Sequence, residues 1–407
     1  MIDFVKIETK DLSKDKLLAN YLLDFKAIVD TGTGEVDEDN QTAIFQKLKF
    51  EIVKGIARDH ININGSVHKY WHNERNFTDY TFNDLLDTLI DLHSKFDINP
   101  FQAVLHNVEY GVNITPPLST GKVIKNLVSY KGMQLLPMNR MKGNSIGKDC
   151  YYQRYAVKIY DKGNQYHLSN DLLRVEVKVI KMEQLKSVGI VTLSDLLSFD
   201  KLKRLGVNLS TLVDDLLYYD TSINLNELKP RERQILKDWR NPVHSEDLRE
   251  SNPKIHDYQR RRFREITAKY SKDNQQKKIS QLVTDKWNEL LNIDSKTLAK
   301  LTAFLQQFPE YNFSQINPSY SKLITPTLTA STKRYCKSCK RDITAQKETS
   351  VFCSAKYVGE DRAKQCRNTD SNIRNNRERS IRKIKRFPLL FPIEPFIKHR
   401  IIHQHYL

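Results

Sequence analysis

The sequence predicts a mixed α+β protein, in which an antiparallel-rich sheet with packed helices precedes a helical region and a small cysteine-rich module. Two alternating runs, at 154–161 and 172–180, flank a polar connector that contains Gly163 and Asn164, which is the pattern of a strand pair. Helical periodicity replaces the alternation after Met182. Four of the five cysteines lie between 336 and 366. Together these observations predict the fold class.

Length and charge limit the kinds of partner. The chain has 407 residues, enough for two or three domains, and a formal net charge of +17. Such an excess of Lys and Arg favours a polyanionic partner. No run of about 18 apolar residues is present to span a bilayer, so we expect nucleic acid and no membrane. The N-terminus lacks a basic-then-apolar signal pattern, which predicts a cytoplasmic protein.

The first domain is predicted over 1–185. Its early elements are strands at 2–7, 45–56 and 61–71 and an acidic surface loop at 31–40. Leucines at helical spacing predict an amphipathic helix over Thr81–Phe96, with Asp79 or Thr81 as its cap.

A further strand is predicted at Val108–Ile114 and is followed by prolines. Glu109, Gly111 and Asn113 share its polar face. The basic segment 119–150 then reads as a connection, either the border of a nucleic-acid channel or a mobile loop; its cations are Lys131, Arg140, Lys142 and Lys148.

The strand pair carries polar side chains on one face. Alternation places Lys158 and Tyr160 together in the first strand, and Arg174, Glu176 and Lys178 together in the second. A tyrosine, a lysine and a carboxylate can therefore project from one surface. An ordinary solvated sheet face has the same pattern, so the residue types alone leave both interpretations open.

The region 186–308 is predicted to be helical and to bind DNA. Prolines punctuate it, and a basic helix follows Tyr258. Its arginines can lie along phosphates or form a solvated face; they are Arg260, Arg261, Arg262 and Arg264. Residues 309–332 have little apolar periodicity and are predicted to be a linker.

The cysteine module, predicted over 333–372, contains the most specific local pattern. Two residues separate Cys336 from Cys339, and Cys353 and Cys366 follow at longer spacing. Four thiolates match tetrahedral structural zinc, and a closed shell excludes a catalytic zinc. The alternative is four ordinary cysteines in a disordered tail. The basic tail 373–407 is suited to phosphate contacts through Arg374, Arg377, Arg382 and Lys383.

A family resemblance rests on the strand pair. The order Ile-Tyr-Asp-Lys-Gly from Ile159, followed by Leu-Arg-Val-Glu-Val-Lys from Leu173, resembles the core of rolling-circle replication initiators. The most similar members are the gene II proteins of filamentous phages and related plasmid replication factors. The resemblance spans the segment 45–190 and leaves the cysteine module outside it.

The resemblance implies roles for individual residues. Tyr160 would attack DNA, while Glu176 and Glu109 would hold Mg²⁺ or Mn²⁺. Lys162 is a candidate by its position alone: two residues past Tyr160, its charge would lower the tyrosine pKa or neutralise a phosphate oxygen. His68, in a short Gly-Ser-x-x-Lys match, and Asn113 are further candidate ligands, although a lone strand histidine is often structural. The His-hydrophobic-His signature of many rolling-circle endonucleases is absent from the predicted strands.

The implied protein is a phage or plasmid replication initiator. It would nick and join origin DNA, single-stranded or supercoiled, through a 5′ phosphotyrosine in rolling-circle replication. It would work in the host bacterial cytoplasm with a host helicase and polymerase. Two alternatives stay open: a non-catalytic DNA-binding or regulatory protein, and a conjugative relaxase.

Overall fold

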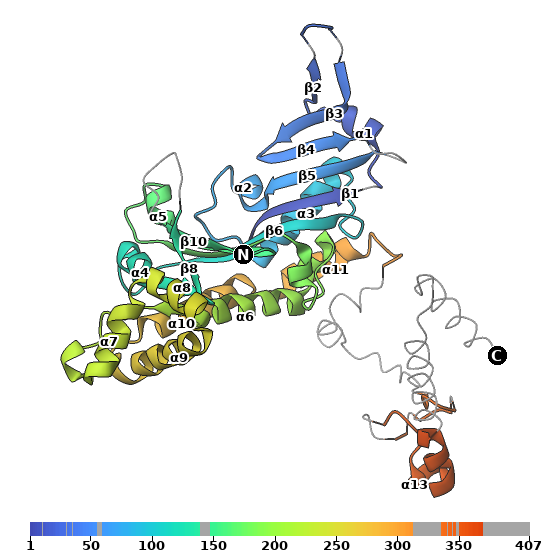
Figure 1. The fold of residues 1–407 in the computed structure, drawn as a ribbon. Coiled ribbons are helices and arrows are strands. Elements are labelled where there is room, and N and C mark those ends of the chain that lie inside the picture. Colours follow the sequence, from blue (N-terminus) through green and yellow to red (C-terminus); the bar gives the residue numbers. More distant parts are fainter. Residues whose placement is uncertain are drawn as a thin grey trace, which may run out of the picture. The chain divides into compact units, whose positions relative to one another are not determined.

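The computed structural model divides the chain into two units, Met1–Leu323 and Ile324–Leu407 (Figure 1). The residues that it describes are 1–9, 11–29, 31–34, 36–54, 59–138, 147–311, 335–339, 341–343, 345–346 and 350–368. The fold class is the predicted one, a mixed α+β protein built on a large antiparallel sheet.

The first unit is organised around a ten-stranded sheet, and neighbouring strands of this sheet are antiparallel throughout. Its spatial order is β2 (Lys26–Val29), β3 (Val36–Phe45), β4 (Leu48–Val53), β5 (His60–Ser66), β1 (Ile2–Thr9), β6 (Val104–Ile114), β12 (Leu173–Val179), β11 (Tyr155–Asp161), β10 (Gly147–Tyr151) and β9 (Leu136–Pro137). The predicted strand pair is thus β11 and β12, and the central strand β6 joins it to the N-terminal strands.

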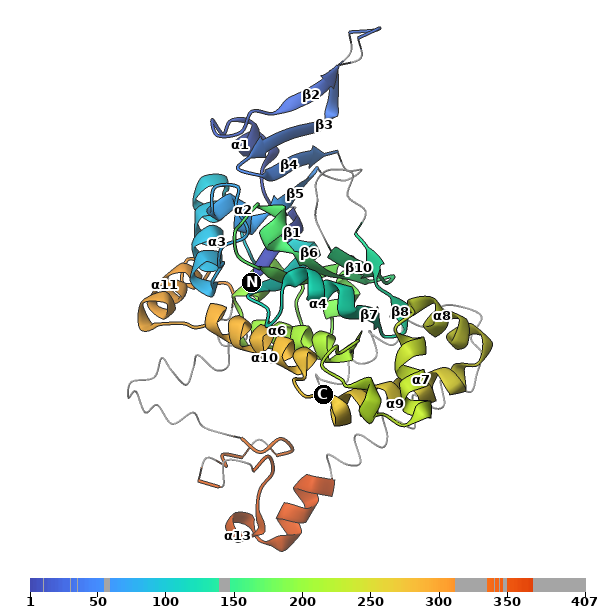
Figure 2. The same ribbon diagram turned by 90° about the vertical axis from the view of Figure 1, so that its left-hand side faces the viewer.

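Helices cover the apolar face of this sheet. The helices described in the first unit are α1 (Lys14–Leu18), α2 (Val67–Trp71), α3 (Phe82–Phe96), α4 (Thr120–Asn126), α5 (Lys162–Gln165), α6 (Phe199–Asp215), α7 (Pro230–Trp239), α8 (Pro242–Ser251), α9 (Pro253–Tyr270), α10 (Gln275–Leu290) and α11 (Ser295–Leu305). The helices on the apolar face include α3, α4, α6 and α10. Figures 1 and 2 show α6 and α10 side by side along the sheet. The indole of Trp287 meets Tyr110 of β6 edge to face, and its Nε1 donates to the Leu202 carbonyl. These helices leave the other face of β6, β12 and β11 for polar side chains.

Helix α3 confirms the prediction over Thr81–Phe96. Thr81 and Asp84 form a capping box, and Asp97 ends the helix in the left-handed conformation with φ 59°. The apolar side of the helix packs on the sheet, where the rings of Phe96 and Phe50 lie 4.8 Å apart. Cap and apolar spacing agree here, which is why the sequence defined both ends.

Three local predictions were wrong. Residues 36–40 belong to strand β3 and not to a loop. The predicted strand 61–71 ends at Ser66, because the Ser66 side chain accepts a hydrogen bond from the Lys69 amide and starts α2. The segment 119–150 is more than a connection, since it includes α4, β7 (Leu127–Tyr130), β8 (Met133–Gln134), β9 and the start of β10.

A second, smaller core lies beside the large sheet. Strands β7 and β8 join β13 (Leu216–Tyr218) in a three-stranded sheet of order β13-β7-β8. The core is completed by α7 and α9, with Trp239 and Phe263 fully buried between them. This packing turns the basic side of α9 outward.

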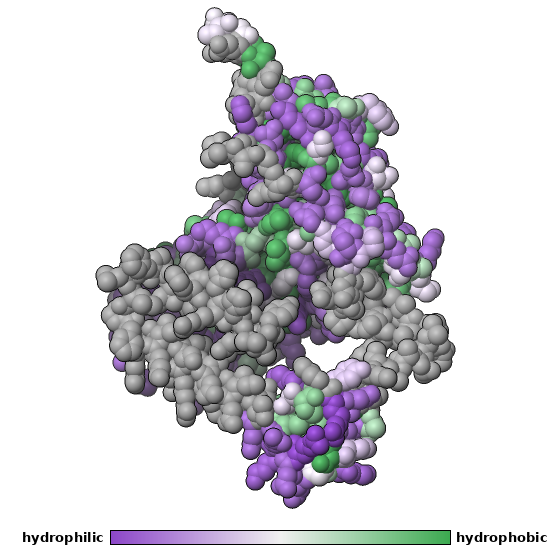
Figure 3. Space-filling model, turned by 90° about the vertical axis from the view of Figure 1, so that its right-hand side faces the viewer, coloured by the Kyte–Doolittle hydropathy of each residue, from purple (hydrophilic) through white to green (hydrophobic). Residues whose placement is uncertain are grey.

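No helix in the described part of the chain is long and apolar enough to cross a membrane. Most of the coloured surface in Figure 3 is hydrophilic, and the hydrophobic side chains on that face form small, scattered groups. Such scattered groups are normal for the surface of a protein and do not mark an interface.

The second unit is a small cysteine-centred fold. An antiparallel bridge joins Tyr335 and Asp342, and α13 (Ala355–Val358) precedes a helical segment at 360–368. Among its described residues, Phe352 and Val358 pack against the core. The buried ones are Cys336, Cys353, Cys366, Ile343, Ala363 and Gln346. So few aliphatic side chains make a core too small to fold without further help.

Candidate functional site

The candidate site is built on the polar face of three adjacent strands, β6, β12 and β11. In the observed register Lys158 lies opposite Glu176, and Arg174 lies opposite Tyr160 on one side and Asn113 on the other. Lys178 lies opposite Glu109. The alternation predicted from the sequence therefore gathers these side chains on one face.

Tyr160 lies between a cation and a carboxylate. Its hydroxyl donates to Oε2 of Glu176 at 3.4 Å, and Nζ of Lys162 donates to the hydroxyl at 3.4 Å. Lys162 belongs to α5 and not to the strand, because β11 ends at Asp161, whose side chain accepts from the Asn164 amide. The lysine nevertheless reaches back over the Tyr160 ring, with Nζ 5.4 Å from its centroid.

The two glutamates are joined by Lys158. Its Nζ lies 3.0 Å from Oε1 of Glu176 and 3.3 Å from Oε2 of Glu109. Each glutamate also has a second cation: Nζ of Lys178 lies 3.0 Å from Oε1 of Glu109, and Nε of Arg174 lies 3.1 Å from Oε2 of Glu176. We call this set, with Tyr160 and Lys162, the charged cluster.

Arg174 extends the charged cluster to the N-terminal strand. Its guanidinium donates to Asn113 at 3.2 Å and to Oδ2 of Asp3 at 3.3 Å. Asp3 in turn accepts hydrogen bonds from Ser66 and Asn76. The guanidinium thus has acceptors on three strands, which fixes its orientation.

Burial and charge shift the pKa values in the cluster. Burial opposes ionisation of Glu176, but the charges of Arg174 and Lys158 outweigh it and hold the pKa of that carboxyl far below its usual range. Burial and the neighbouring Glu176 charge raise the pKa of Glu109. Burial and the charge of Arg174 lower the pKa of Lys162 to about 7, so near neutral pH its amine is present in both protonation states.

The cluster is not a solvated sheet face. Arg174 is 1% exposed, Glu176 2% and Lys158 9%. Buried charges are costly unless each one has partners, and a sheet that served only as a scaffold would be at least as stable with apolar groups there. The alternative of an ordinary solvated face is therefore wrong.

Tyr160 is also largely buried, since the residue is 5% exposed. The ring of Tyr166 and the loop at 76–78 lie on this side: Tyr166 contacts Lys162 and donates to Asn76, and the Phe77 carbonyl accepts from Asn113.

The remaining candidate ligands do not complete a metal shell. His68 lies in α2, where its ring stacks on Tyr80 at 4.9 Å and its Nε2 is 3.4 Å from the Thr78 hydroxyl. Burial lowers the pKa of His68 strongly, so the ring is neutral. The amide of Asn113 is bonded to Arg174 and Phe77. In the described part of the chain, only the four cysteines form a group of three or more His, Cys, Asp or Glu close enough for a metal.

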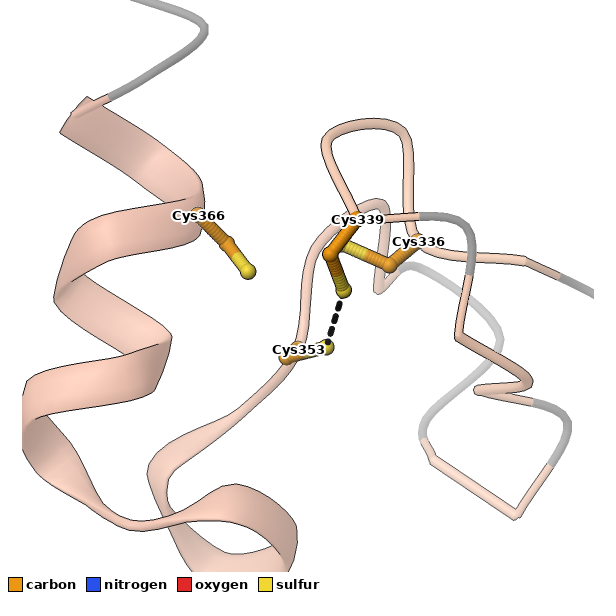
Figure 4. Close-up of side chains that lie close together, drawn as sticks. All are labelled: Cys336, Cys339, Cys353 and Cys366. Atoms are coloured by element: carbon orange, nitrogen blue, oxygen red, sulfur yellow. Dashed lines mark hydrogen bonds between the residues drawn. The ribbon is translucent and has the colours of Figure 1, made fainter.

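The cysteines of the second unit converge as predicted. Figure 4 shows Cys366 reaching from a helix toward Cys336, Cys339 and Cys353 on neighbouring loops. Their sulfur atoms all lie within 4.8 Å of one another, and Sγ of Cys339 is 3.5 Å from Sγ of Cys353. Tetrahedral zinc with bonds of about 2.3 Å needs sulfur atoms about 3.8 Å apart. The four cysteines can therefore bind a metal such as zinc.

The basic helix α9 presents its arginines at the surface. Arg261 is exposed, Arg262 pairs with Glu232 and Glu265, and Arg264 donates to the Asp215 carbonyl at 2.8 Å. Arg260 lies 3.8 Å from Asp257. The other predicted phosphate contacts fall outside the described residues; they are Arg374, Arg377, Arg382 and Lys383. Arg140 and Lys142, from the segment predicted as a channel border or a mobile loop, also lie outside them.

Four charged members of the site had no role assigned from the sequence: Lys158, Arg174, Lys178 and Asp3. Lys158 and Arg174 were placed on the correct face by the alternation, but nothing in a single strand showed that Lys158 spans two strands to reach Glu109. Asp3 joins the site through the pairing of β1 with β6, a contact between segments about a hundred residues apart. No local signal identifies it.

Comparisons with known proteins give little further information. No protein-family model matches the chain, and no curated protein matches it in sequence. Among solved structures, the chain is similar to a rolling circle replication initiator protein from Geobacillus stearothermophilus, with a TM-score of 0.33 and 12% identity over 53% of this chain and 84% of that one. A likeness this distant carries no argument, and the case for function rests on the residues themselves.

Proposed function

We propose that this chain is a replication initiation protein of a phage or plasmid, which nicks and rejoins origin DNA through Tyr160 in rolling-circle replication. The observation that carries the proposal is the position of the Tyr160 hydroxyl, between Nζ of Lys162 and Oε2 of Glu176 in a cluster rich in cations. A phenol held in this way has a base and an orienting acceptor, as an activated nucleophile requires.

The reaction is an exchange of phosphate esters. The Tyr160 oxygen forms a bond to phosphorus while the bond from phosphorus to the 3′ oxygen breaks, and the product is a 5′ phosphotyrosine beside a free 3′ hydroxyl. The phenol O–H first turns from Glu176 toward the uncharged amine of Lys162 and then passes its proton to that amine. The leaving 3′ oxygen takes a proton from solvent. The reverse reaction rejoins the strand, and the bond energy is kept in the phosphotyrosine.

Cations of the cluster stabilise the charge that develops on the phosphate. Lys162 becomes an ammonium group when it takes the phenol proton, and it then lies beside the reacting phosphate. Arg174 is opposite Tyr160 across the strand pair and adds a second positive charge. Glu176 accepts the phenol hydrogen bond and directs the lone pairs of the oxygen outward.

The resemblance also implies Mg²⁺ or Mn²⁺ at Glu109 and Glu176, with His68 or Asn113 as further ligands. Such an ion would neutralise charge on the phosphate. In this arrangement the glutamate oxygens already accept from Lys158, Lys178 and Arg174. The donor set does not fit the ion, and no step above depends on it.

The other regions would position the DNA. We propose that the basic side of α9 binds phosphates of the origin, because Arg261 is exposed and its neighbours lie on the same outward surface. We propose that zinc holds the four cysteines and gives the second unit its fold. A host polymerase would then extend the free 3′ end while a host helicase unwinds the duplex.

Replacing Tyr160 with phenylalanine tests the chemistry. Tyr160→Phe should bind origin DNA as the wild type does and form no covalent adduct, since it lacks the attacking oxygen. The measurement is mass spectrometry of a denatured nicking reaction, which also identifies the residue that carries the nucleotide. Tyr151→Phe is the matched control, because Tyr151 is an exposed tyrosine on the adjacent strand β10. An adduct on Tyr160→Phe would refute the assignment.

The burial of Tyr160 favours a second candidate, a DNA-binding or regulatory protein without catalysis. In that case the charged cluster would only stabilise the sheet. A supercoiled plasmid that carries the origin separates the two functions, because a nicking enzyme relaxes it and a binding protein leaves it closed.

A further inference from the structure

The space between Glu109 and Glu176 already holds a cation that belongs to the chain. Nζ of Lys158 is within 3.3 Å of one oxygen of each glutamate. The other oxygens accept from Lys178 and Arg174. All four carboxylate oxygens therefore have a positively charged donor, whereas Mg²⁺ binds through one or two carboxylates at about 2.0–2.1 Å and would have to displace such a donor.

The charges of the cluster are balanced without an ion. Lys158, Lys178 and Arg174 carry three positive charges, and Glu109, Glu176 and Asp3 carry three negative charges. Lys158 is 9% exposed and Arg174 1%, so a divalent ion would add two uncompensated charges to a buried network. A phosphodiester adds one negative charge instead, and Lys162, once it has taken the phenol proton, lies beside Tyr160 and compensates that charge.

Lysine can reach this position because of the strand register. Lys158 lies directly opposite Glu176, and Gly111 lies opposite Glu176 on the other side. Gly111 has no side chain, so the lysine on β11 passes over β12 and meets Glu109 on β6. The position of Lys158 is therefore set by the register of three strands, β11, β12 and β6.

We propose that the Lys158 ammonium occupies the place that a divalent ion would take between Glu109 and Glu176, and that Tyr160 cleaves DNA without a divalent metal. The inference rests on the proposed function and defines its cofactor requirement. Bond making and breaking are those given above; the charge on the phosphate is stabilised by Lys162 and Arg174. Lys158 is a positioning residue, because it touches the glutamates and fixes the carboxylate that orients Tyr160.

The first experiment uses the intact wild-type chain. Protein and buffers are depleted of Mg²⁺ and Mn²⁺ with a chelating resin, and elemental analysis checks that zinc stays in the cysteine module. Nicking of a supercoiled origin plasmid should proceed at the same rate, within a factor of about three, with and without added Mn²⁺; a cofactor that stabilised the transition state would change the rate about a hundredfold or more. A loss of that size on depletion, reversed by Mn²⁺ or Mg²⁺, overturns the inference.

A second measurement does not depend on activity. Electron paramagnetic resonance of free Mn²⁺ reports how much of the ion the protein removes from solution. Wild-type protein should bind none at the cluster, whereas Lys158→Met should bind one Mn²⁺, because two carboxylates then face each other without the ammonium between them. Wild-type binding that Glu176→Gln abolishes would show that the ion displaces the lysine, and would overturn the inference.

Matched variants test whether Lys158 in particular keeps Mn²⁺ out of the cluster. Lys178→Met also removes an ammonium from Glu109 but leaves Lys158 in place, so it should acquire no Mn²⁺ site. Lys158→Arg keeps a cation and should also bind none, which covers the case in which Lys158→Met does not fold. If no nicking occurs under any condition, the proposed function fails, and Mn²⁺ binding still decides the occupancy of the site.

Discussion

The charged cluster and the four-cysteine cluster both contain residue types that commonly bind metals. Of these two, only the cysteines are arranged in the structure as ligands of a metal ion. The sulfur atoms of the second unit lie within 4.8 Å of one another, at a spacing that suits a tetrahedral ion. The glutamates of the first unit have lysine and arginine between and beside them. The ligand types alone therefore do not identify a metal site. The space between the ligands must also be free of side-chain cations such as Lys158.

The largest expected contrast comes from removing zinc. Extraction with a strong chelator should unfold the second unit, because the metal supplies about 10 kcal/mol or more in such modules and the apolar core there is minimal. The first unit should keep its thermal transition, since its core contains no cysteine of that cluster. Circular dichroism melting and limited proteolysis measure the two units separately.

Cysteine variants provide the control for that experiment. Cys353→Ser should lose zinc, whereas Cys150→Ser should retain one zinc per chain, because Cys150 lies in β10 of the first unit. Retention of a protease-resistant second unit after complete zinc removal would contradict the prediction.

In the first unit, removing one partner of a buried ion pair should lower the free energy of unfolding by less than zinc removal does in the second unit, but still substantially. Arg174→Met leaves Asp3 and Glu176 as buried carboxylates without their guanidinium. Breaking a buried pair in this way lowers the free energy of unfolding by about 3–5 kcal/mol. Urea denaturation of the two proteins measures it, and a difference below about 1 kcal/mol would show that solvent already reaches these groups.

The pH dependence of stability should identify Lys162. Its pKa is about 7 in the folded chain and near 10.5 when unfolded, so above pH 7 the unfolded state binds the extra proton and the stability rises with pH. Relative to Lys162→Met, the wild type should gain about 2 kcal/mol between about pH 7 and 9, because each pH unit of one-proton linkage is worth about 1.4 kcal/mol. Parallel pH profiles for the two proteins would mean that Lys162 is an ordinary charged lysine.

The smallest expected effect concerns the exposed charge of α9. Arg261→Ala should change the free energy of unfolding by less than about 0.5 kcal/mol. If Arg261 contacts a phosphate, the same variant should reduce by about 1 the slope of the logarithm of DNA affinity against the logarithm of salt concentration. Filter binding at several salt concentrations measures the slope, and an unchanged slope would remove Arg261 from the DNA interface.

Local patterns were enough for much of the fold. The cap and the leucine spacing of α3, and the alternation of β11 and β12, are written in consecutive residues and were predicted correctly. His68 was misplaced because the strand before it ends at a serine cap, and one Ser is a weaker signal than the alternation that precedes it. The helical segment after Met182 was also predicted, though not that it covers the sheet.

The site could be predicted only in part, because its chemistry depends on contacts between strands. Tyr160 and Glu176 lie on adjacent strands, and their alternation suffices to place both on one face. The bridge from Lys158 to Glu109, and the contact of Arg174 with Asp3, depend on a strand order that no short segment encodes. Only the folded chain therefore shows that the cation between Glu109 and Glu176 is the Lys158 ammonium.

The contact between Trp287 and the sheet limits how far the chain can be shortened. A Cβ at Gly206 would lie 2.3 Å from the indole, so α6 and α10 interlock closely above β6. A fragment cut after the last sheet strand would leave Tyr110 and its apolar neighbours facing water. Expression trials should keep the chain through α11, because a shorter fragment would expose this apolar surface and aggregate.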